Sequence, residues 1–237
     1  MNLVLFDIDG TLTHSESLDA EIYLQSLSEV FSFSDVSSDW SLYQHTTDSG
    51  ILSELFQSRL GRAPEASEIA AFRMHFVNAI SAAALQTPCC EIPGARQLLN
   101  HLTGLQSYRV GLATGGWSDS ARCKMLSAGM PYDALPSASA DDAMSRVSIM
   151  QIAIDRVIAR SEGRRPDSVV YVGDGIWDAR ACRDLTIPFV GIATGPHAQT
   201  LRAEGAVEVF PDYSEMGEFC TTLTLARQPF GNLSAKW

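Results

Sequence analysis

The chain has 237 residues, of which 46% are hydrophobic and 19% are charged, enough to bury one large domain or a domain with a smaller insert. Its 17 Lys and Arg against 28 Asp and Glu give a formal net charge of −11, so we expect no binding to nucleic acid or to an anionic membrane surface. The five cysteines include no C-x-x-C pair, which disfavours a disulfide framework and a zinc site. No apolar run approaches the ~20 residues of a membrane span and no signal-peptide pattern is present, so we expect a cytoplasmic protein.

The first predicted element is a buried strand at residues 3–6, where the apolar run "LVLF" is followed at once by "DIDGT". Asp7 and Asp9 therefore stand directly behind a buried strand, and Gly10 lets the chain turn away from it. Carboxylates in such a place are costly unless something pairs with them. This pair of aspartates is the first candidate for a functional site.

Residues 15–88 contain no convincing strand pattern. Their apolar residues recur at helical spacing in the segments 18–31, 51–60 and 69–84. The pattern predicts a helical insert that leaves the chain after the first strand and returns near "TPCCEIPG". Ligands of open α/β sheets bind at the carboxyl ends of the strands, and the insert would lie above such an end. We therefore interpret residues 15–88 as a helical cap.

After residue 90 strand and helix patterns alternate. Residues 108–114, 168–173 and 189–194 are typical of short buried strands, and 206–210 form a weaker one. Between them, a helix is predicted from the N-cap Ser145 to residue 160. Alternation of this kind indicates a Rossmann-like α/β core, with a parallel sheet and helices on both faces. Residues 1–14 and 89–237 are assigned to this core.

Polar residues gather where the predicted strands end. They are Asp7, Asp9, Gly10 and Thr11, then Thr114 and Gly115, then Arg146 at a helix start, then Asp174 and Asp178. In a parallel sheet these ends share one edge, so we expect the residues to converge. Carboxylates crowded into one pocket resist ionising, and a divalent cation removes the conflict. Oxygen ligands without a nearby His or Cys favour Mg²⁺.

Such a cluster could transfer a phosphoryl group. Asp7 would attack phosphorus and form an aspartyl-phosphate, while Asp9 would protonate the leaving oxygen and later activate water. Thr114, Arg146 and backbone N–H groups would hold the phosphate oxygens. Each piece alone has an ordinary explanation: turns for the Asp and Gly motifs, a helix cap for Asp178 and a solvated helix start for Arg146. Their joint order along the chain favours the functional interpretation.

At these motifs the chain resembles the haloacid dehalogenase superfamily over nearly its whole length, especially its phosphoglycolate phosphatase-like members with a helical cap. The resemblance rests on "DIDGT" (7–11), "LATGG" (112–116) and "VYVGDGIWD" (170–178). It implies Asp7 as nucleophile, Asp9 as acid/base and Thr114 as a phosphate ligand. It also implies a Mg²⁺ site formed by Asp7, the main-chain carbonyl of Asp9, Asp174 and Asp178. We further expect Gly10, Thr11 and Gly115 to contact the phosphate.

The third motif of the superfamily departs from its usual form of Lys followed by Pro. Here Arg146 is followed by Val147, and the chain's two lysines are Lys124 and Lys236. Arg binds phosphate well, so Arg146 is our assignment, with Lys124, on the helix after the second motif, as the alternative. Asp9 distinguishes the chain from the dehalogenase branch, and the lack of any lysine in the cap excludes a Schiff-base mechanism from there.

The cap is expected to set specificity. The polar loop 44–50 offers His45, Thr46, Thr47 and Asp48 as substrate-facing candidates, with helix capping by Thr47 or Asp48 as the alternative. His14 either faces the cleft or is a solvated hinge residue.

The sequence thus predicts a Mg²⁺-dependent phosphatase that acts on a small phosphorylated metabolite, as a monomer or homodimer. Two alternatives stay open. A phosphomutase or phosphotransferase would pass the phosphoryl group to a hydroxyl other than water, and a non-catalytic binding protein would keep the fold alone.

Overall fold

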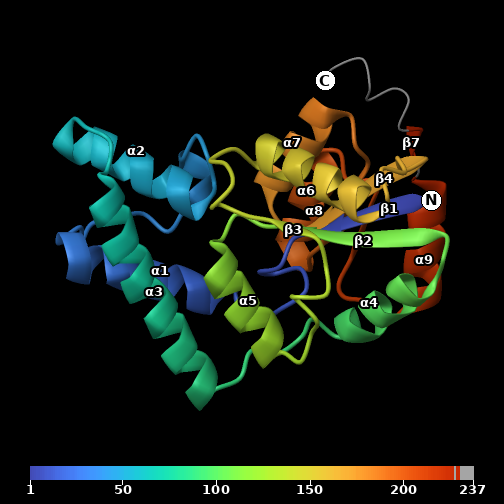
Figure 1. Cartoon of the computed structure of the whole chain (residues 1–237), viewed down its shortest axis with the longest axis horizontal. Helices are drawn as coiled ribbons and strands as arrows, with labels where there is room; N and C mark the ends of the chain where they lie inside the picture. Colours follow the sequence, from blue (N-terminus) through green and yellow to red (C-terminus); the bar gives the residue numbers. More distant parts are fainter. Residues whose placement is uncertain (227, 230–237) are drawn as a thin grey trace.

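The computed structural model describes residues 1–226 and the backbone of residues 228–229. Its centre is a parallel sheet in the order β3-β2-β1-β4-β5-β6, with the short β7 antiparallel to β4 (Figure 1). The strands are β1 Asn2–Phe6, β2 Tyr108–Ala113, β3 Ser137–Ala138, β4 Ser168–Gly173, β5 Phe189–Ile192, β6 Glu208–Phe210 and β7 Gln228–Pro229. The predicted Rossmann-like α/β fold is confirmed.

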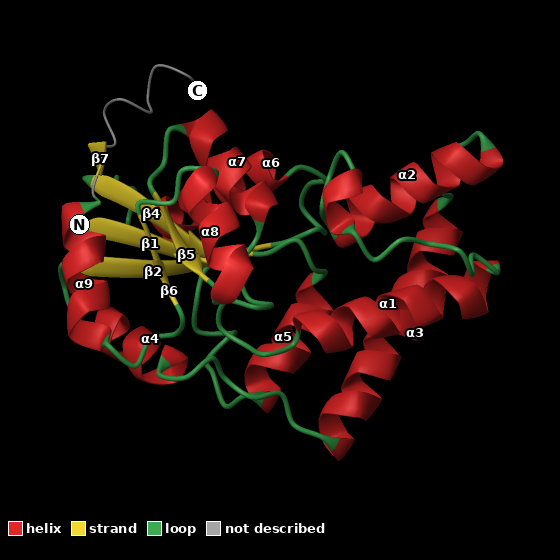
Figure 2. Ribbon diagram, turned by 180° about the vertical axis from the view of Figure 1, so that it is seen from behind, coloured by secondary structure: helices red, strands yellow, loops and turns green. Residues whose placement is uncertain are grey.

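Helices cover both faces of the sheet, as Figure 2 shows from behind. Side chains of a strand alternate between faces. Val4 and Phe6 of β1 pack on one face with α4 Ala95–Gly104, α5 Ser118–Ser127 and α9 Met216–Leu225. Leu3 and Leu5 pack on the other with α6 Arg146–Arg160, α7 Ile176–Leu185 and α8 Gly195–Ala203. Because β1 is buried on both faces, its apolar run is continuous.

Three helices and a short 3-10 helix fill the predicted cap segment 15–88, which contains no strand. They are α1 Glu16–Phe31, η1 Trp40–Leu42, α2 Asp48–Leu60 and α3 Ala66–Gln86. Together with their loops they lie to one side of the sheet (Figure 1), and we call them the cap. The cap contributes most of an aromatic core. In it Tyr23, Phe72 and Phe76 pack against Trp117, which belongs to the sheet domain and precedes α5. This shared core joins the cap to the sheet domain.

Local chemistry explains where the predicted elements begin and end. The side chain of Ser145 accepts a hydrogen bond from the amide of Ser148, so the predicted N-cap of α6 is confirmed. The strand predicted at 189–194 ends at Ile192, because Thr194 is the N-cap of α8. The weaker strand begins at Glu208. None of the described helices is long and apolar enough to cross a membrane.

Candidate active site

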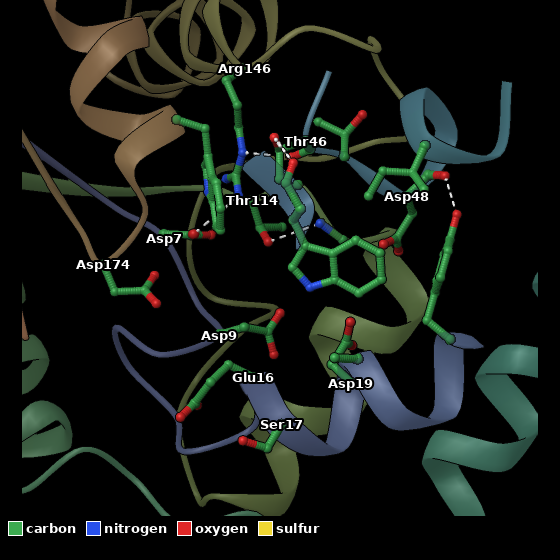
Figure 3. Close-up of a pocket in the computed structure, with 18 residues that line it drawn as sticks. Asp7, Asp9, Glu16, Ser17, Asp19, Thr46, Asp48, Thr114, Arg146 and Asp174 are labelled. Carbon is green, nitrogen blue, oxygen red and sulfur yellow. Dashed lines mark hydrogen bonds and ion pairs between the residues drawn. The ribbon is translucent and has the colours of Figure 1, made fainter. Parts of the chain in front are cut away.

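The carboxyl edge of β1, β2 and β4 opens into a cavity of about 310 Å³ between the sheet and the cap (Figure 3). Since β1 pairs with both β2 and β4, the polar residues behind these strands become neighbours. Six predicted site residues line the cavity: Asp7, Asp9, Thr114, Gly115, Arg146 and Asp174. Gly10, Thr11 and Asp178 are not among the lining residues. The expected convergence of these strand ends at one edge of the sheet is present, whereas the catalytic and binding roles of the residues stay predictions.

Three carboxylates form a group suited to a metal ion. Asp7, Asp174 and Asp178 each offer an oxygen, and these atoms all lie within 4.8 Å of one another. Oδ1 of Asp7 is buried and has no hydrogen-bond partner in the protein. An orphaned carboxylate oxygen beside two further carboxylates fits a hard divalent cation. The side chain of Asp9 is not part of the group, which leaves only its main-chain carbonyl for the metal role implied by the resemblance.

The electrostatics of this group are unfavourable without added positive charge. Burial raises the pKa of Asp174 well above its usual range, and the neighbouring Asp7 and Asp178 raise it further. Burial likewise raises the pKa of Asp178 to about 7, even though Arg146 acts in the opposite direction. A bound divalent cation would favour the ionised carboxylates.

Gly10 is needed where the loop after β1 passes Asp174. Its φ of +69° lies in the left-handed region, and a Cβ built on it would be 2.2 Å from Oδ2 of Asp174. The next residue, Thr11, donates a hydrogen bond from Oγ1 to Oδ1 of Asp174 at 3.3 Å. Gly10 and Thr11 thus fix a carboxylate of the metal group. Whether they also contact phosphate stays a prediction.

Arg146 is the cation beside Asp7. Its Nη2 lies 3.3 Å from Oδ2 of Asp7, and its Nη1 lies 3.5 Å from Oδ1 of Asp178. Its Nε donates to the main-chain carbonyl of Thr46 in the cap at 3.2 Å. Burial opposes its charge, but Asp178 and Asp7 together raise the pKa of Arg146 above its ordinary value. The guanidinium is therefore charged and lies where it can meet a phosphate oxygen.

Lys124, the alternative for the third motif, lies elsewhere. Its Nζ is 2.7 Å from Oδ2 of Asp9 and also bonds Asp19 of α1. Burial opposes its charge, yet Asp19 and Asp9 raise its pKa above the ordinary value of a lysine. Lys236 lies outside the described residues. Of the two candidates, Arg146 contacts Asp7 and Lys124 contacts Asp9, and the third-motif role of Arg146 stays a prediction.

The second motif, residues 112–116, contacts the cap. Thr114 is 1% exposed, and its hydroxyl oxygen accepts from the amide of Gly116, which leaves its proton free to donate. A Cβ on Gly115 would lie 2.8 Å from both the Arg146 guanidinium and the carbonyl of Thr46, so this position has no room for a side chain. The carbonyl of Gly115 accepts from the amide of Asp48 at 2.8 Å.

The loop 44–50 divides into residues that face the cavity and residues that do not. Thr46, Thr47 and Asp48 line the cavity, whereas His45 does not. Thr47 is also the N-cap of α2, since its hydroxyl oxygen accepts from the amide of Gly50, so the capping alternative is correct for this residue. His14 is exposed and is not among the lining residues, which agrees with a solvated hinge residue.

Sequence reasoning missed the face of α1 that closes the cavity. Glu16, Asp19, Ala20 and Tyr23 all line it. Their spacing of three, four and seven residues from Glu16 places them on one face of a helix. The sequence did contain a signal for them, because Glu16 and Asp19 are two acidic residues on one face of a predicted helix, directly after the hinge candidate His14. Figure 3 shows Asp19 and Glu16 on the side of the cavity opposite Arg146.

One family of known proteins matches the sequence. The sequence model of the haloacid dehalogenase-like hydrolases matches residues 1–186. No curated protein sequence matches the chain.

Solved structures resemble the chain over most of its length. A hydrolase from Pseudomonas syringae superposes with a TM-score of 0.69 at 20% identity, covering 90% of this chain and 94% of that one. CbbY from Rhodobacter sphaeroides, solved in complex with phosphate, gives 0.69 at 18% identity, covering 91% and 96%. A predicted phosphoglycolate phosphatase from Haemophilus somnus gives 0.60 at 17% identity, covering 92% and 97%. At these identities the likeness shows the fold.

Proposed function

Because this chain belongs to the haloacid dehalogenase-like hydrolases, we propose that it is a Mg²⁺-dependent phosphatase acting on a small phosphorylated metabolite. One observation carries the proposal. Asp7 lies beside the charged Arg146 and in one group with the carboxylates of Asp174 and Asp178, and one of its oxygens is buried without a partner. A carboxylate held in this way, at the wall of the cavity between the sheet and the cap, is placed to act as a nucleophile.

The residues fit a Mg²⁺ ion held by Asp7, Asp174, Asp178 and the main-chain carbonyl of Asp9. When bound, the ion supplies positive charge that keeps the carboxylates ionised and attracts the oxygens of a phosphate. The protein's own groups do the rest. Arg146 and the hydroxyl of Thr114 bind and orient the phosphate, and the cap limits access of water.

The proposed reaction has two steps. An oxygen of Asp7 forms a bond to phosphorus while the ester P–O bond breaks, and Asp9 gives its proton to the leaving alcohol oxygen. A water molecule then attacks phosphorus, its proton passes to Asp9, and the P–O bond to Asp7 breaks to release inorganic phosphate. Asp9 thus ends in its starting protonation state, and Asp7 is a free carboxylate again.

The charge of the cap side limits the alcohol part of the substrate. Glu16, Asp19 and Asp48 line that side, and Arg146 is the cationic side chain among the described lining residues. Glu16 is the acid that carries the argument, because Asp19 pairs with Lys124 and burial raises the pKa of Asp48 well above its usual range. Arg146 is already placed to meet the phosphate. A second acid group on the substrate would therefore face acidic side chains without a cation to pair with. We propose a phosphomonoester whose alcohol part is neutral or cationic.

Phosphate release tests the reaction class. The wild type and Asp7→Asn would be assayed side by side with 4-nitrophenyl phosphate and Mg²⁺, with circular dichroism confirming that both are folded. We expect release by the wild type and a loss of about 10⁴-fold or more in the variant, since removal of a nucleophile alone can cost ~10⁶ in kcat. Equal turnover by both proteins would refute the mechanism. Transfer of phosphate to added sugars, in place of water, would instead indicate a phosphotransferase.

A further inference from the structure

Lys124 of α5 is buried in a place that the proposed reaction does not explain. Its side chain is 0% exposed, and an ammonium group removed from water is costly unless it is fully paired. Its Nζ bonds Oδ2 of Asp9 at 2.7 Å on the sheet side and Asp19 on the cap side. One lysine therefore connects the expected acid/base residue with the first helix of the cap.

The carboxylate of Asp9 is held from both sides. Oδ1 accepts a hydrogen bond from the hydroxyl of Ser15 at 2.5 Å, while Oδ2 accepts from Lys124. Ser15 is itself buried, and its hydroxyl shares a hydrogen bond with Thr13. With one donor on each oxygen, rotation of the carboxylate is restricted, while each oxygen keeps a second lone-pair position that can hold the proton that Asp9 gives and regains. Lys124 is the charged member of this pair of donors.

Asp19 in turn holds Lys124. It lies in α1, lines the same cavity as Asp9 and keeps 17% of its side chain exposed (Figure 3). The position of Lys124 therefore depends on α1, and the orientation of Asp9 depends on Lys124. Arg146 makes a comparable link on the opposite side of the cavity, between Asp7 and the cap loop at Thr46.

We propose that Lys124 is a positioning residue, which holds the carboxylate of Asp9 in place for proton transfer and ties that position to the cap through Asp19. The inference rests on the proposed phosphatase function. It requires no change in the protonation of Lys124. A purely structural role, in which Lys124 only neutralises buried acids, predicts a loss of activity that is the same for every substrate.

The leaving group distinguishes these two roles. A nitrophenolate leaves without much help from an acid, whereas an alkoxide requires a proton. The value of kcat/KM reports the steps up to release of this group. We expect Lys124→Met to lower kcat/KM for 2-hydroxyethyl phosphate by ~10²–10³-fold, but to lower that for 4-nitrophenyl phosphate by less than about tenfold. Lys124→Arg is expected to recover part of the loss with the alkyl ester.

Two further variants serve as a control and as a replacement for a variant that does not fold. Arg122→Met removes an exposed cation from the same helix, where it pairs with Asp133, and should leave both substrates unaffected. In Lys124→Met the buried carboxylate of Asp19 loses its cation, which could prevent folding. The double variant Lys124→Met/Asp19→Asn removes that carboxylate as well and replaces the single variant if the latter does not fold. Equal losses on both esters in a folded variant would overturn the proposal.

A crystal structure of the folded variant gives an answer that does not depend on activity. We expect the Asp9 carboxylate to leave its present orientation once Lys124 is gone, while its Ser15 partner stays in place. An unmoved Asp9 would overturn the positioning role. If the wild type released no phosphate from any ester, the proposed function would fail, and the crystal structure would still decide whether Lys124 orients Asp9.

Discussion

The guanidinium of Arg146, the residue that we propose for the third-motif role, lies 3.3 Å from the carboxylate of Asp7. Arg146→Met removes this cation, and we expect kcat/KM to fall by ~10²–10³-fold, the usual cost of losing one group that stabilises the transition state. Arg146→Lys keeps the charge without the fork of donors and should lose less. Steady-state kinetics with 4-nitrophenyl phosphate would measure both.

Arg156→Met is the matched control for Arg146. Arg156 lies on the same helix but pairs with Asp142 at the surface, with 46% of its side chain exposed. We expect its kcat/KM to stay within about twofold of the wild type, since exposed ion pairs contribute little. Equal losses in Arg146→Met and Arg156→Met would mean that the effect comes from α6 and not from the contact with Asp7.

Gly10→Ala should weaken the metal site. The added Cβ would lie 2.2 Å from Oδ2 of Asp174, so that carboxylate must move. We expect Mg²⁺ affinity, measured by calorimetry, to fall by ~10–100-fold, as for other changes that disturb the support of a metal ligand.

Gly61→Ala separates this clash from backbone strain. Gly61 also has a positive φ, +68°, but nothing lies within 4 Å of its Cβ position. Both variants should lose about 1 kcal/mol or somewhat more of stability, because alanine is disfavoured in this region. Only Gly10→Ala should lose Mg²⁺ binding, and an equal loss in both would show that Asp174 is not involved.

In EDTA, the free energy of unfolding should fall as the pH rises from about 4 to about 7. Burial raises the pKa of Asp178 from 3.8 to about 7 in the folded protein. Between these values the folded state binds more protons than the unfolded state, so the slope of stability against pH is negative. Urea titrations at several pH values would measure it.

Excess Mg²⁺ should reverse this trend, because the ion binds the ionised carboxylates and stabilises the folded state more as the pH rises. Asp178→Asn should reduce the slope in EDTA, since one titrating group is gone. Identical slopes in the two proteins would contradict the assignment. Activity should disappear in EDTA and return with Mg²⁺, and full activity after exhaustive chelation would refute the metal requirement.

Substrates of equal size and different charge test the acidic cap side. We expect kcat/KM for phosphoglycolate to be about tenfold or more below those for 2-hydroxyethyl phosphate and 2-aminoethyl phosphate, a difference of about 1.4 kcal/mol. Glu16→Gln removes negative charge from that side and should narrow the gap. Burial raises the pKa of Asp48 well above its usual range, so Asp48→Asn should change the gap less. A preference for phosphoglycolate in the wild type would contradict the proposed class of substrate.

The sequence was most informative where physical constraints are local. The unbroken apolar run of β1 predicted a strand that is buried on both faces, as the structure shows. The aspartates that follow it could then be placed at the edge of the sheet from topology alone. The strand β3 escaped prediction because it has only two residues, Ser137 and Ala138, too few for any periodicity.

Contacts between distant segments could not be predicted in the same way. The sequence offers Lys124 as an alternative phosphate ligand. In the structure its partners are Asp9 and Asp19, which lie on either side of it and are far from it in the sequence. Such a pairing depends on how α3 packs against both α1 and α5. The acidic stripe of α1 was visible as a helix face, but only the docked cap shows that this face looks into the cavity.

The strand that comes before the other strands in this sequence lies in the middle of the sheet. β1 ends at Phe6, but its neighbours β2 and β4 are complete only at Ala113 and Gly173. All the helices of the cap emerge from the ribosome in between. Pairing across such long separations is slow, so we expect the cap helices to form while β1 is still unpaired. Asp7 and Asp9 are therefore synthesised before the cap, whereas Asp174 follows β4, so the proposed metal site can form only after β4 has been made.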